Sequence, residues 1–92
     1  MRILSQDGIK FDIEYENCHL VVNEKCCEIE AETSNPNFTP VMASYSSIEK
    51  CRKAMEMLRN VYYESERERT YKDGVSYLTT HFQFPADDEI EV

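Results

Sequence analysis

The longest segment with a regular pattern of apolar and polar positions runs from Ser46 to Arg67. Apolar side chains recur there every three or four residues and charged side chains fill the positions between them, which is typical of an amphipathic helix with one face toward a core. The side chains expected on that face are Ile48, Cys51, Met55, Leu58 and Tyr62. We expect Ser46 to be the N-cap residue, because Glu49 follows three positions later, as in a capping box.

The remainder of the chain shows the shorter alternation of β-strands. Residues 9–15 alternate strictly between apolar and charged side chains, which indicates a strand with one buried face. Predicted strands cover residues 2–5, 9–15, 18–23, 26–32, 38–45 and 75–84. Turns are predicted at residues 6–8 and 72–74, where Asp-Gly pairs occur. Because Pro40 cannot donate a ladder hydrogen bond, the fifth strand should lie at an edge or begin after this residue.

These elements predict a single α+β domain over residues 1–92. It should contain an antiparallel meander of about five strands and a C-terminal strand, all packed on the one long helix at about residues 46–67. The expected core consists of Ile3, Phe11, Ile13, Leu20, Val22, Ile29, Ile48, Cys51, Met55, Leu58, Tyr62, Leu78, Phe82 and Phe84. Residues 86–92 are predicted to form a short, acidic and mobile tail after Pro85.

The charge of the chain bears on its partners. Aspartate and glutamate together number 18, lysine and arginine number 10, and the formal net charge is −8. Such a chain is repelled by phosphate groups, so we expect no direct binding to nucleic acid. The sequence shows no signal peptide and no apolar run that would span a membrane, so we expect a cytoplasmic protein without membrane contact. Its four cysteines should then be reduced.

A zinc site is the first candidate chemistry to weigh. Cys18 and His19 lie on one predicted strand, and Cys26 and Cys27 lie on the next. All four are residue types that bind zinc, but structural zinc sites use pairs of ligands that are two to four residues apart. Adjacent residues of a strand point to opposite faces of the sheet, so at most one residue of each pair could share a face with one of the other pair. No metal-binding residue and no cofactor is therefore predicted.

A cysteine nucleophile is the second candidate. Such a residue needs a lowered thiol pKa and a histidine within reach. Cys51 lies on the buried face of the predicted helix and should be inert. Cys26 is the cysteine expected to be exposed, but Glu28 and Glu30 follow it closely, and their charges disfavour a thiolate. We therefore predict no catalytic residue.

A protein-binding surface is the interpretation that the sequence favours. Glu28, Glu30 and Glu32 share one face of a predicted strand, and Met57 and Tyr63 lie away from the buried face of the helix. Tyrosine is enriched at interfaces, and a row of carboxylates suits a partner with a basic surface. These five residues form the candidate interaction surface. Two alternatives stay open: solvation alone explains the charges, and a sheet edge could support a homodimer.

Four runs of sequence carry a resemblance to a known group of proteins. They are MRILSQDG at residues 1–8, YE at residues 15–16, KAMEMLR at residues 53–59 and FQFPADDE at residues 82–89. In these runs the chain resembles a group of small uncharacterised proteins that are encoded in phages and prophages of low-GC Gram-positive bacteria. The resemblance implies a bacterial cytoplasm and a phage context, and it brings no assigned activity or functional residue.

Three functions are consistent with these observations. The first is a non-enzymatic protein that binds a host or phage protein through an acidic, tyrosine-bearing surface. The second is a structural or accessory protein of phage replication or virion complexes. The third is a small thiol- or metal-dependent enzyme, which the cysteine spacing and the two histidines weigh against.

Overall fold

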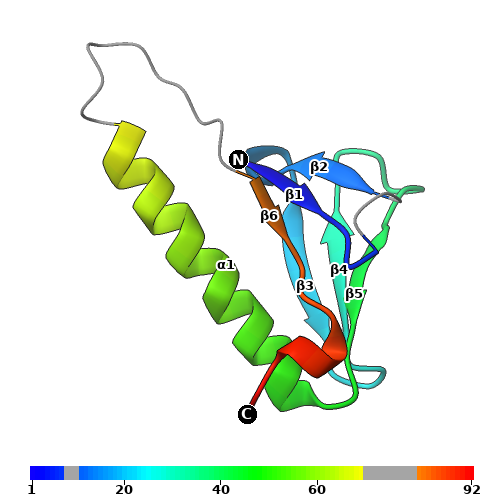
Figure 1. Cartoon of the computed structure of the whole chain (residues 1–92). Helices are drawn as coiled ribbons and strands as arrows, with labels where there is room; N and C mark the ends of the chain where they lie inside the picture. The colour runs from blue at the N-terminus through cyan, green and yellow to red at the C-terminus, as the bar shows by residue number, and fades with distance from the viewer. Residues whose placement is uncertain (8–10, 70–80) are drawn as a thin grey trace.

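The computed structural model describes residues 1–7, 11–69 and 81–92, and the side chains of residues 67–69 are outside that description. Its elements along the chain (Figure 1) are β1 (Arg2–Leu4), β2 (Asp12–Glu14), the 3₁₀ turn η1 (Tyr15–Asn17), β3 (His19–Asn23), β4 (Glu28–Glu32), β5 (Val41–Ser44), α1 (Ile48–Arg69), β6 (His81–Gln83) and the 3₁₀ turn η2 (Asp87–Glu89). Helix and strands share one core, so the α+β class is confirmed.

The described strands are divided between two three-stranded sheets, so the predicted meander does not run through a single sheet. In the first sheet, β1 lies between β2, to which it is antiparallel, and β6, to which it is parallel. In the second sheet, β4 lies between β3 and β5 and is antiparallel to both. The chain leaves the first sheet through η1, which separates β2 from β3. Helix α1 carries the chain from the second sheet back toward the first, where β6 pairs with β1 (Figure 1).

The strands are shorter than the alternation predicts. Strand β4 begins at Glu28 instead of residue 26, because Cys27 has a positive φ of 54° and belongs to the preceding turn. Strand β5 begins directly after Pro40, as expected from the missing donor of proline. Parts of the predicted strands at residues 9–15 and 75–84 and of the turn at residues 6–8 lie outside the described residues, as does the whole predicted turn at residues 72–74.

The N-terminus of α1 differs from the prediction by one residue. The hydroxyl of Ser47 accepts a hydrogen bond from the Lys50 N–H at 3.3 Å, so Ser47 is the N-cap residue. Ser46 is engaged elsewhere: its N–H and its hydroxyl both donate to the carboxylate of Asp87, at 2.7 and 3.1 Å. The predicted capping box of Ser46 with Glu49 is therefore wrong, because Asp87 from the C-terminal segment binds Ser46.

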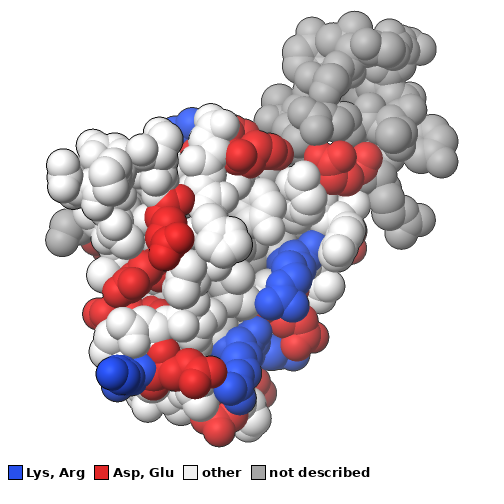
Figure 2. Space-filling view, turned by 180° about the vertical axis from the view of Figure 1, so that it is seen from behind, with Lys and Arg blue, Asp and Glu red and all other residues white. Residues whose placement is uncertain are grey.

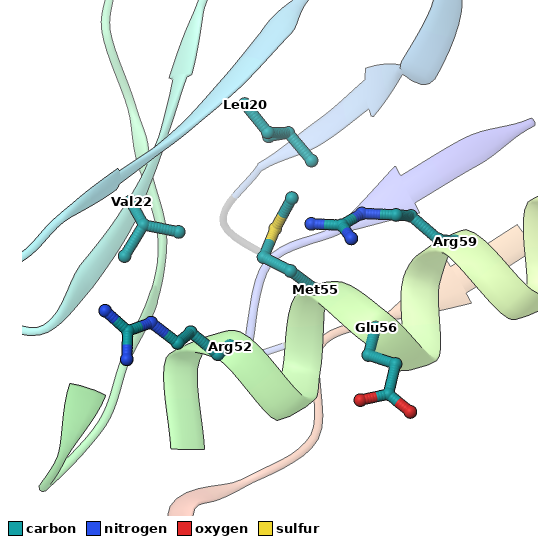
Figure 3. Close-up of a pocket in the computed structure, with 6 residues that line it drawn as sticks. All are labelled: Leu20, Val22, Arg52, Met55, Glu56 and Arg59. Carbon is teal, nitrogen blue, oxygen red and sulfur yellow. The ribbon is translucent and has the colours of Figure 1, made fainter. Parts of the chain in front are cut away.

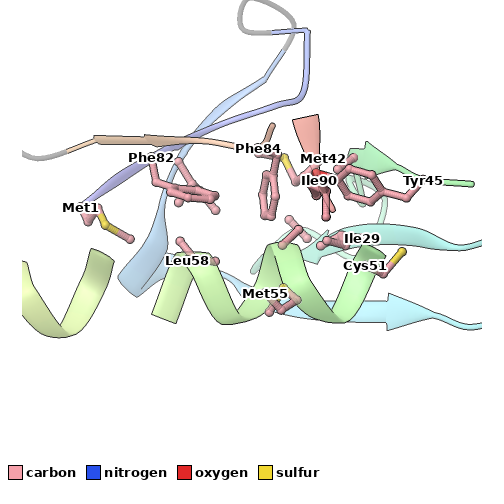
Figure 4. Close-up of a cluster of buried hydrophobic side chains, with 14 residues drawn as sticks. Met1, Ile29, Met42, Tyr45, Cys51, Met55, Leu58, Phe82, Phe84 and Ile90 are labelled. Carbon is pink, nitrogen blue, oxygen red and sulfur yellow. The ribbon is translucent and has the colours of Figure 1, made fainter. Parts of the chain in front are cut away.

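The core lies between α1 and the two sheets (Figure 4). The predicted core residues that are buried are Ile3, Ile29, Cys51, Met55, Leu58, Phe82 and Phe84. Those that are half-buried against this cluster are Phe11, Ile13, Leu20, Val22, Ile48 and Tyr62. Leu78 lies outside the described residues. The large core side chains that the prediction omitted are Met1, Met42, Tyr45 and Ile90.

The C-terminal segment is packed against the helix start, so the prediction of a mobile tail is wrong. Ile90 is only 4% exposed and belongs to the core cluster. Lys50 donates from Nζ to the Asp87 carboxylate at 3.1 Å and to the Asp87 carbonyl at 2.8 Å. The Tyr45 hydroxyl donates to the Pro85 carbonyl at 2.8 Å. The segment is therefore held by the burial of Ile90 and by hydrogen bonds from Tyr45 and Lys50.

Candidate interaction surfaces

The three glutamates of β4 point away from the core. Ile29 and Ala31, which alternate with them, are both 0% exposed and face α1. Successive side chains of a strand point to opposite faces, so Glu28, Glu30 and Glu32 line the outer face of the second sheet. The structure thus brings these three carboxylates together in a row on the central strand. We call this row and the outer surface around it the acidic face.

The strand residues beside these glutamates carry no positive charge from lysine or arginine. Strands β3, β4 and β5 contain neither residue type. Glu30 lies between Val21 on β3 and Val41 on β5, and Val41 is 39% exposed. Figure 2 shows a row of acidic side chains on the left of the view with a basic side chain at its lower end, and further basic side chains, with acidic ones among them, toward the right. The face therefore combines negative charge with exposed apolar groups, which suits a basic partner surface.

The two helix residues of the candidate surface lie elsewhere. Tyr63 is 66% exposed, as the helical pattern predicts, and its ring centroid is 6.4 Å from that of Tyr62. Met57 is half-buried and packs against the core, so its assignment to an exposed surface is corrected. Both residues are on α1, which covers the inner side of the sheet, whereas the glutamates are on the outer side. The structure does not bring the two groups into one patch.

Three of the four thiols have a raised pKa, which is the opposite of activation. Cys26 Sγ donates a hydrogen bond to Glu28 Oε1 at 3.0 Å, and this bond, with the nearby charges of Glu28 and Glu30, raises the pKa of the Cys26 thiol. Burial raises the pKa of Cys18 and of Cys51. A raised thiol pKa lowers the thiolate fraction at neutral pH. The expectation that the glutamates disfavour a thiolate at Cys26 is therefore confirmed in direction.

A second surface feature is a groove between β3 and α1 that the sequence did not indicate. It has a volume of about 500 Å³ and is lined by Leu20, Val22, Arg52, Met55, Glu56 and Arg59. Figure 3 shows Arg52 and Arg59 extending from α1 on either side of Met55, toward the side chains from β3. The helical period places Arg52 and Arg59 seven residues apart on the same face, but only the neighbouring strand turns that face into a groove.

The described residues offer neither a metal centre nor a membrane span. In residues 1–7, 11–69 and 81–92, no group of three or more histidine, cysteine, aspartate or glutamate side chains is placed to hold a metal ion. No helix in that part of the chain combines the length and apolar character needed to cross a membrane.

Comparisons of the chain with protein-family models, with curated proteins and with solved structures found no match. Functional inference therefore rests on the surfaces described above.

Proposed function

We propose that the protein is a non-enzymatic binding protein that attaches through its acidic face to a basic surface of another protein. The observation that carries this proposal is the row of Glu28, Glu30 and Glu32 on the central strand of a sheet whose three strands contain no lysine or arginine. The exposed valine beside Glu30 adds apolar contact area. The partner is a protein of the bacterial cytoplasm, as the resemblance to phage and prophage proteins implies.

Electrostatics gives this arrangement a physical role. A surface that carries one sign of charge raises the rate at which an oppositely charged partner arrives and orients correctly. The net charge of −8 adds to the same long-range field and repels nucleic acid. The raised pKa values of three thiols lend no support to the alternative of a thiol-dependent enzyme.

The proposal is tested by affinity capture from a bacterial lysate with matched variants. The first variant combines Glu28→Gln, Glu30→Gln and Glu32→Gln, which removes the charge and keeps the size of each side chain. The control combines Glu64→Gln, Asp88→Asn and Glu91→Gln, three exposed carboxylates elsewhere on the molecule. Both variants change the net charge by the same amount, so a difference between them reports position and not total charge.

We expect the wild-type protein and the control to retain the same basic protein, and the acidic-face variant to lose it. Circular dichroism on all three proteins verifies that the fold is intact. Retention of the same protein by all three would overturn the proposal. So would a partner that is lost equally from both variants, because the total charge would then explain its binding.

A further inference from the structure

The outer edge of β3 is an open strand edge beside a groove, and its hydrogen-bonding groups can be assigned from the ladder. The Ala31 N–H donates to the Pro40 carbonyl at 3.0 Å, so the main chain of Ala31 is directed toward β5. Leu20 lies opposite Ala31 in the β3–β4 ladder. In an antiparallel ladder such a pair exchanges no hydrogen bonds, and the N–H and C=O of Leu20 therefore point outward.

Val22 has the same orientation, because main-chain direction alternates along a strand and Val22 is two residues further on. Val21, between them, pairs with Glu30 and directs its groups inward. In the part of the chain that the structure describes, no other backbone group bonds to the outward groups of Leu20 and Val22.

The opposite edge of the same sheet is occupied. The Gln6 N–H donates to the Met42 carbonyl at 2.7 Å, and the Ser44 N–H donates to the Gln6 side-chain oxygen at 3.1 Å. The N-terminal segment thus covers β5. Exposed edges are usually protected by charge, proline or a covering segment, and β3 (His19–Asn23) has no proline or charged lysine to protect it.

The side chains around this edge are apolar at the base and basic at the rim. Leu20 and Val22 point toward Met55, which is 9% exposed, so the base of the groove is apolar (Figure 3). Among the described residues, Arg52 makes one ion pair, with Glu24 at 3.4 Å, and both side chains are largely exposed. Arg59 makes no ion pair within the described residues.

Glu56 also lines the groove, and its charge must be weighed against the two arginines. It lies 3.9 Å from Lys53 Nζ and extends from α1 in a different direction from both guanidinium groups (Figure 3). Arg52 shares its charge with Glu24, so the positive charge of the rim toward β3 that has no ion-pair partner among the described residues is that of Arg59.

We propose that this groove binds an extended, acidic segment of a partner protein as an additional strand on β3. Main-chain bonds to Leu20 and Val22 hold the segment, as in other cases of strand addition. Its carboxylates, on the face toward α1, meet Arg52 and Arg59, and its apolar side chains lie on the opposite face. The two arginines are separated by about 10 Å along the helix, which three residues of a strand also span, so acidic side chains two to four residues apart reach both.

A second copy of this chain fits the edge less well. Its β3 (His19–Asn23) carries no carboxylate to pair with the arginines, and it brings its own Arg52 and Arg59 toward the same rim. Charge complementarity thus favours an acidic segment over self-association. The site is separate from the acidic face, so either proposal can fail without the other.

The binding test uses a fluorescein-labelled heptapeptide of alternating glutamate and valine, blocked at both ends, and measures its anisotropy. A matched heptapeptide of alternating lysine and valine tests the charge. The glutamate peptide with every amide N-methylated tests the main-chain bonds, because it can donate no main-chain hydrogen bond to β3. We expect that, of the three peptides, only the unmethylated glutamate–valine peptide binds saturably. The absence of saturable binding up to millimolar concentration, or equal binding of any two of the three, would overturn the proposal.

The protein side is tested with charge-matched variants. Arg52→Gln with Arg59→Gln should weaken binding about fivefold, as expected for two exposed ion pairs. The control is Lys25→Gln with Lys53→Gln, two exposed lysines that do not line the groove, and it should leave the affinity unchanged. The acidic-face variant should also leave it unchanged. Equal weakening by the arginine and lysine variants would refute the assignment of the site.

Amide hydrogen exchange tests the strand addition itself. In the free protein the Val21 amide should be protected, and those of Leu20 and Val22 should exchange rapidly. The glutamate peptide should slow exchange at Leu20 and Val22. If the peptide binds and these two amides keep their free exchange rates, the peptide is not added to β3 and the proposal fails. A free protein that sediments as a dimer, and whose Leu20 and Val22 amides are already protected from exchange, would identify a second copy of the chain as the occupant. This result would also overturn the proposal.

Discussion

Replacing Ile90 by alanine tests whether the C-terminal segment is part of the core. Ile90 is 4% exposed and packs in the same cluster as residues of α1 and both sheets. Truncating a buried isoleucine to alanine costs about 2–5 kcal/mol, and the lower part of this range applies where the site can partly collapse. The segment is short and close to the chain end, so we expect a loss of about 2–3 kcal/mol. A chain of 92 residues has a total stability of about 5–14 kcal/mol, so the loss is large.

The assay is equilibrium unfolding in urea, followed by circular dichroism. With a slope of about 1 kcal/mol per molar urea, the Ile90→Ala midpoint should fall by about 2–3 M. Val92→Ala is the matched control, because Val92 is 76% exposed, and its midpoint should change by less than about 0.5 M. Equal midpoints for Ile90→Ala and the wild type would refute the packing of residues 86–92 against α1.

Three further predictions concern the helix, the N-terminal ion pairs and the exposed thiol. Leu58→Ala should cost about 2–5 kcal/mol in the same urea assay, because Leu58 is 0% exposed, whereas Lys53→Ala should cost less than about 0.5 kcal/mol, since its ion pair is exposed. The hydrogen bond from the N-terminal amino group lowers the pKa of Glu14 below its ordinary value of 4.5, so Glu14 stabilises the fold above that value. This contribution is lost as the pH falls through the lowered pKa, and Glu14→Gln should flatten the acid limb of a stability–pH profile. Glu28→Gln should accelerate alkylation of Cys26 by iodoacetamide at neutral pH, measured by mass spectrometry, because the hydrogen bond to Glu28 raises the thiol pKa.

Each of these three has a contradicting result. Equal losses for Leu58→Ala and Lys53→Ala would mean that the buried face of α1 is assigned incorrectly. An unchanged acid limb in the Glu14→Gln variant would show that the N-terminal pair contributes no net stability. Equal alkylation rates of Cys26 in the Glu28→Gln variant and in the wild type would show that the hydrogen bond does not hold the proton on sulfur.

The sequence predicted the elements whose signal is local. The helical period located α1 to within two residues at each end, and its buried positions Cys51, Met55 and Leu58 are all in the core. Strict alternation likewise identified the buried and exposed faces of β4 (Glu28–Glu32). In both cases the repeat of the backbone alone assigns the side chains to faces.

The sequence did not predict features that depend on contacts between distant segments. A run of acidic residues with a single isoleucine is typical of a solvated tail, and nothing local indicates that Ile90 enters the core. The choice of Ser47 over Ser46 as N-cap residue depends on Asp87, some 40 residues away in the chain. The parallel pairing of β6 with β1 likewise joins the two ends of the chain.

Of the two candidate surfaces, the acidic face could be predicted from the local sequence and the groove could not. The acidic row could be predicted because three glutamates alternate along one strand. The groove could not, because Arg52 and Arg59 have the pattern of a solvated helix face. The two arginines line a groove with Leu20 and Val22 because the open edge of β3 lies beside α1, and this arrangement is visible only in the structure. Tyr63 and the glutamates were grouped by composition, and the sheet separates them.

The central claim, binding through the acidic face, is tested most directly by the salt dependence of the association rate with the captured partner. Screening shortens the Debye length from about 10 Å at 0.1 M salt to about 3 Å at 1 M. We predict that the wild-type association rate falls at least about tenfold over this range. The variant with Glu28, Glu30 and Glu32 changed to glutamine should start slower at low salt and show a flatter dependence. An association rate that is insensitive to both salt and these substitutions would contradict the claim.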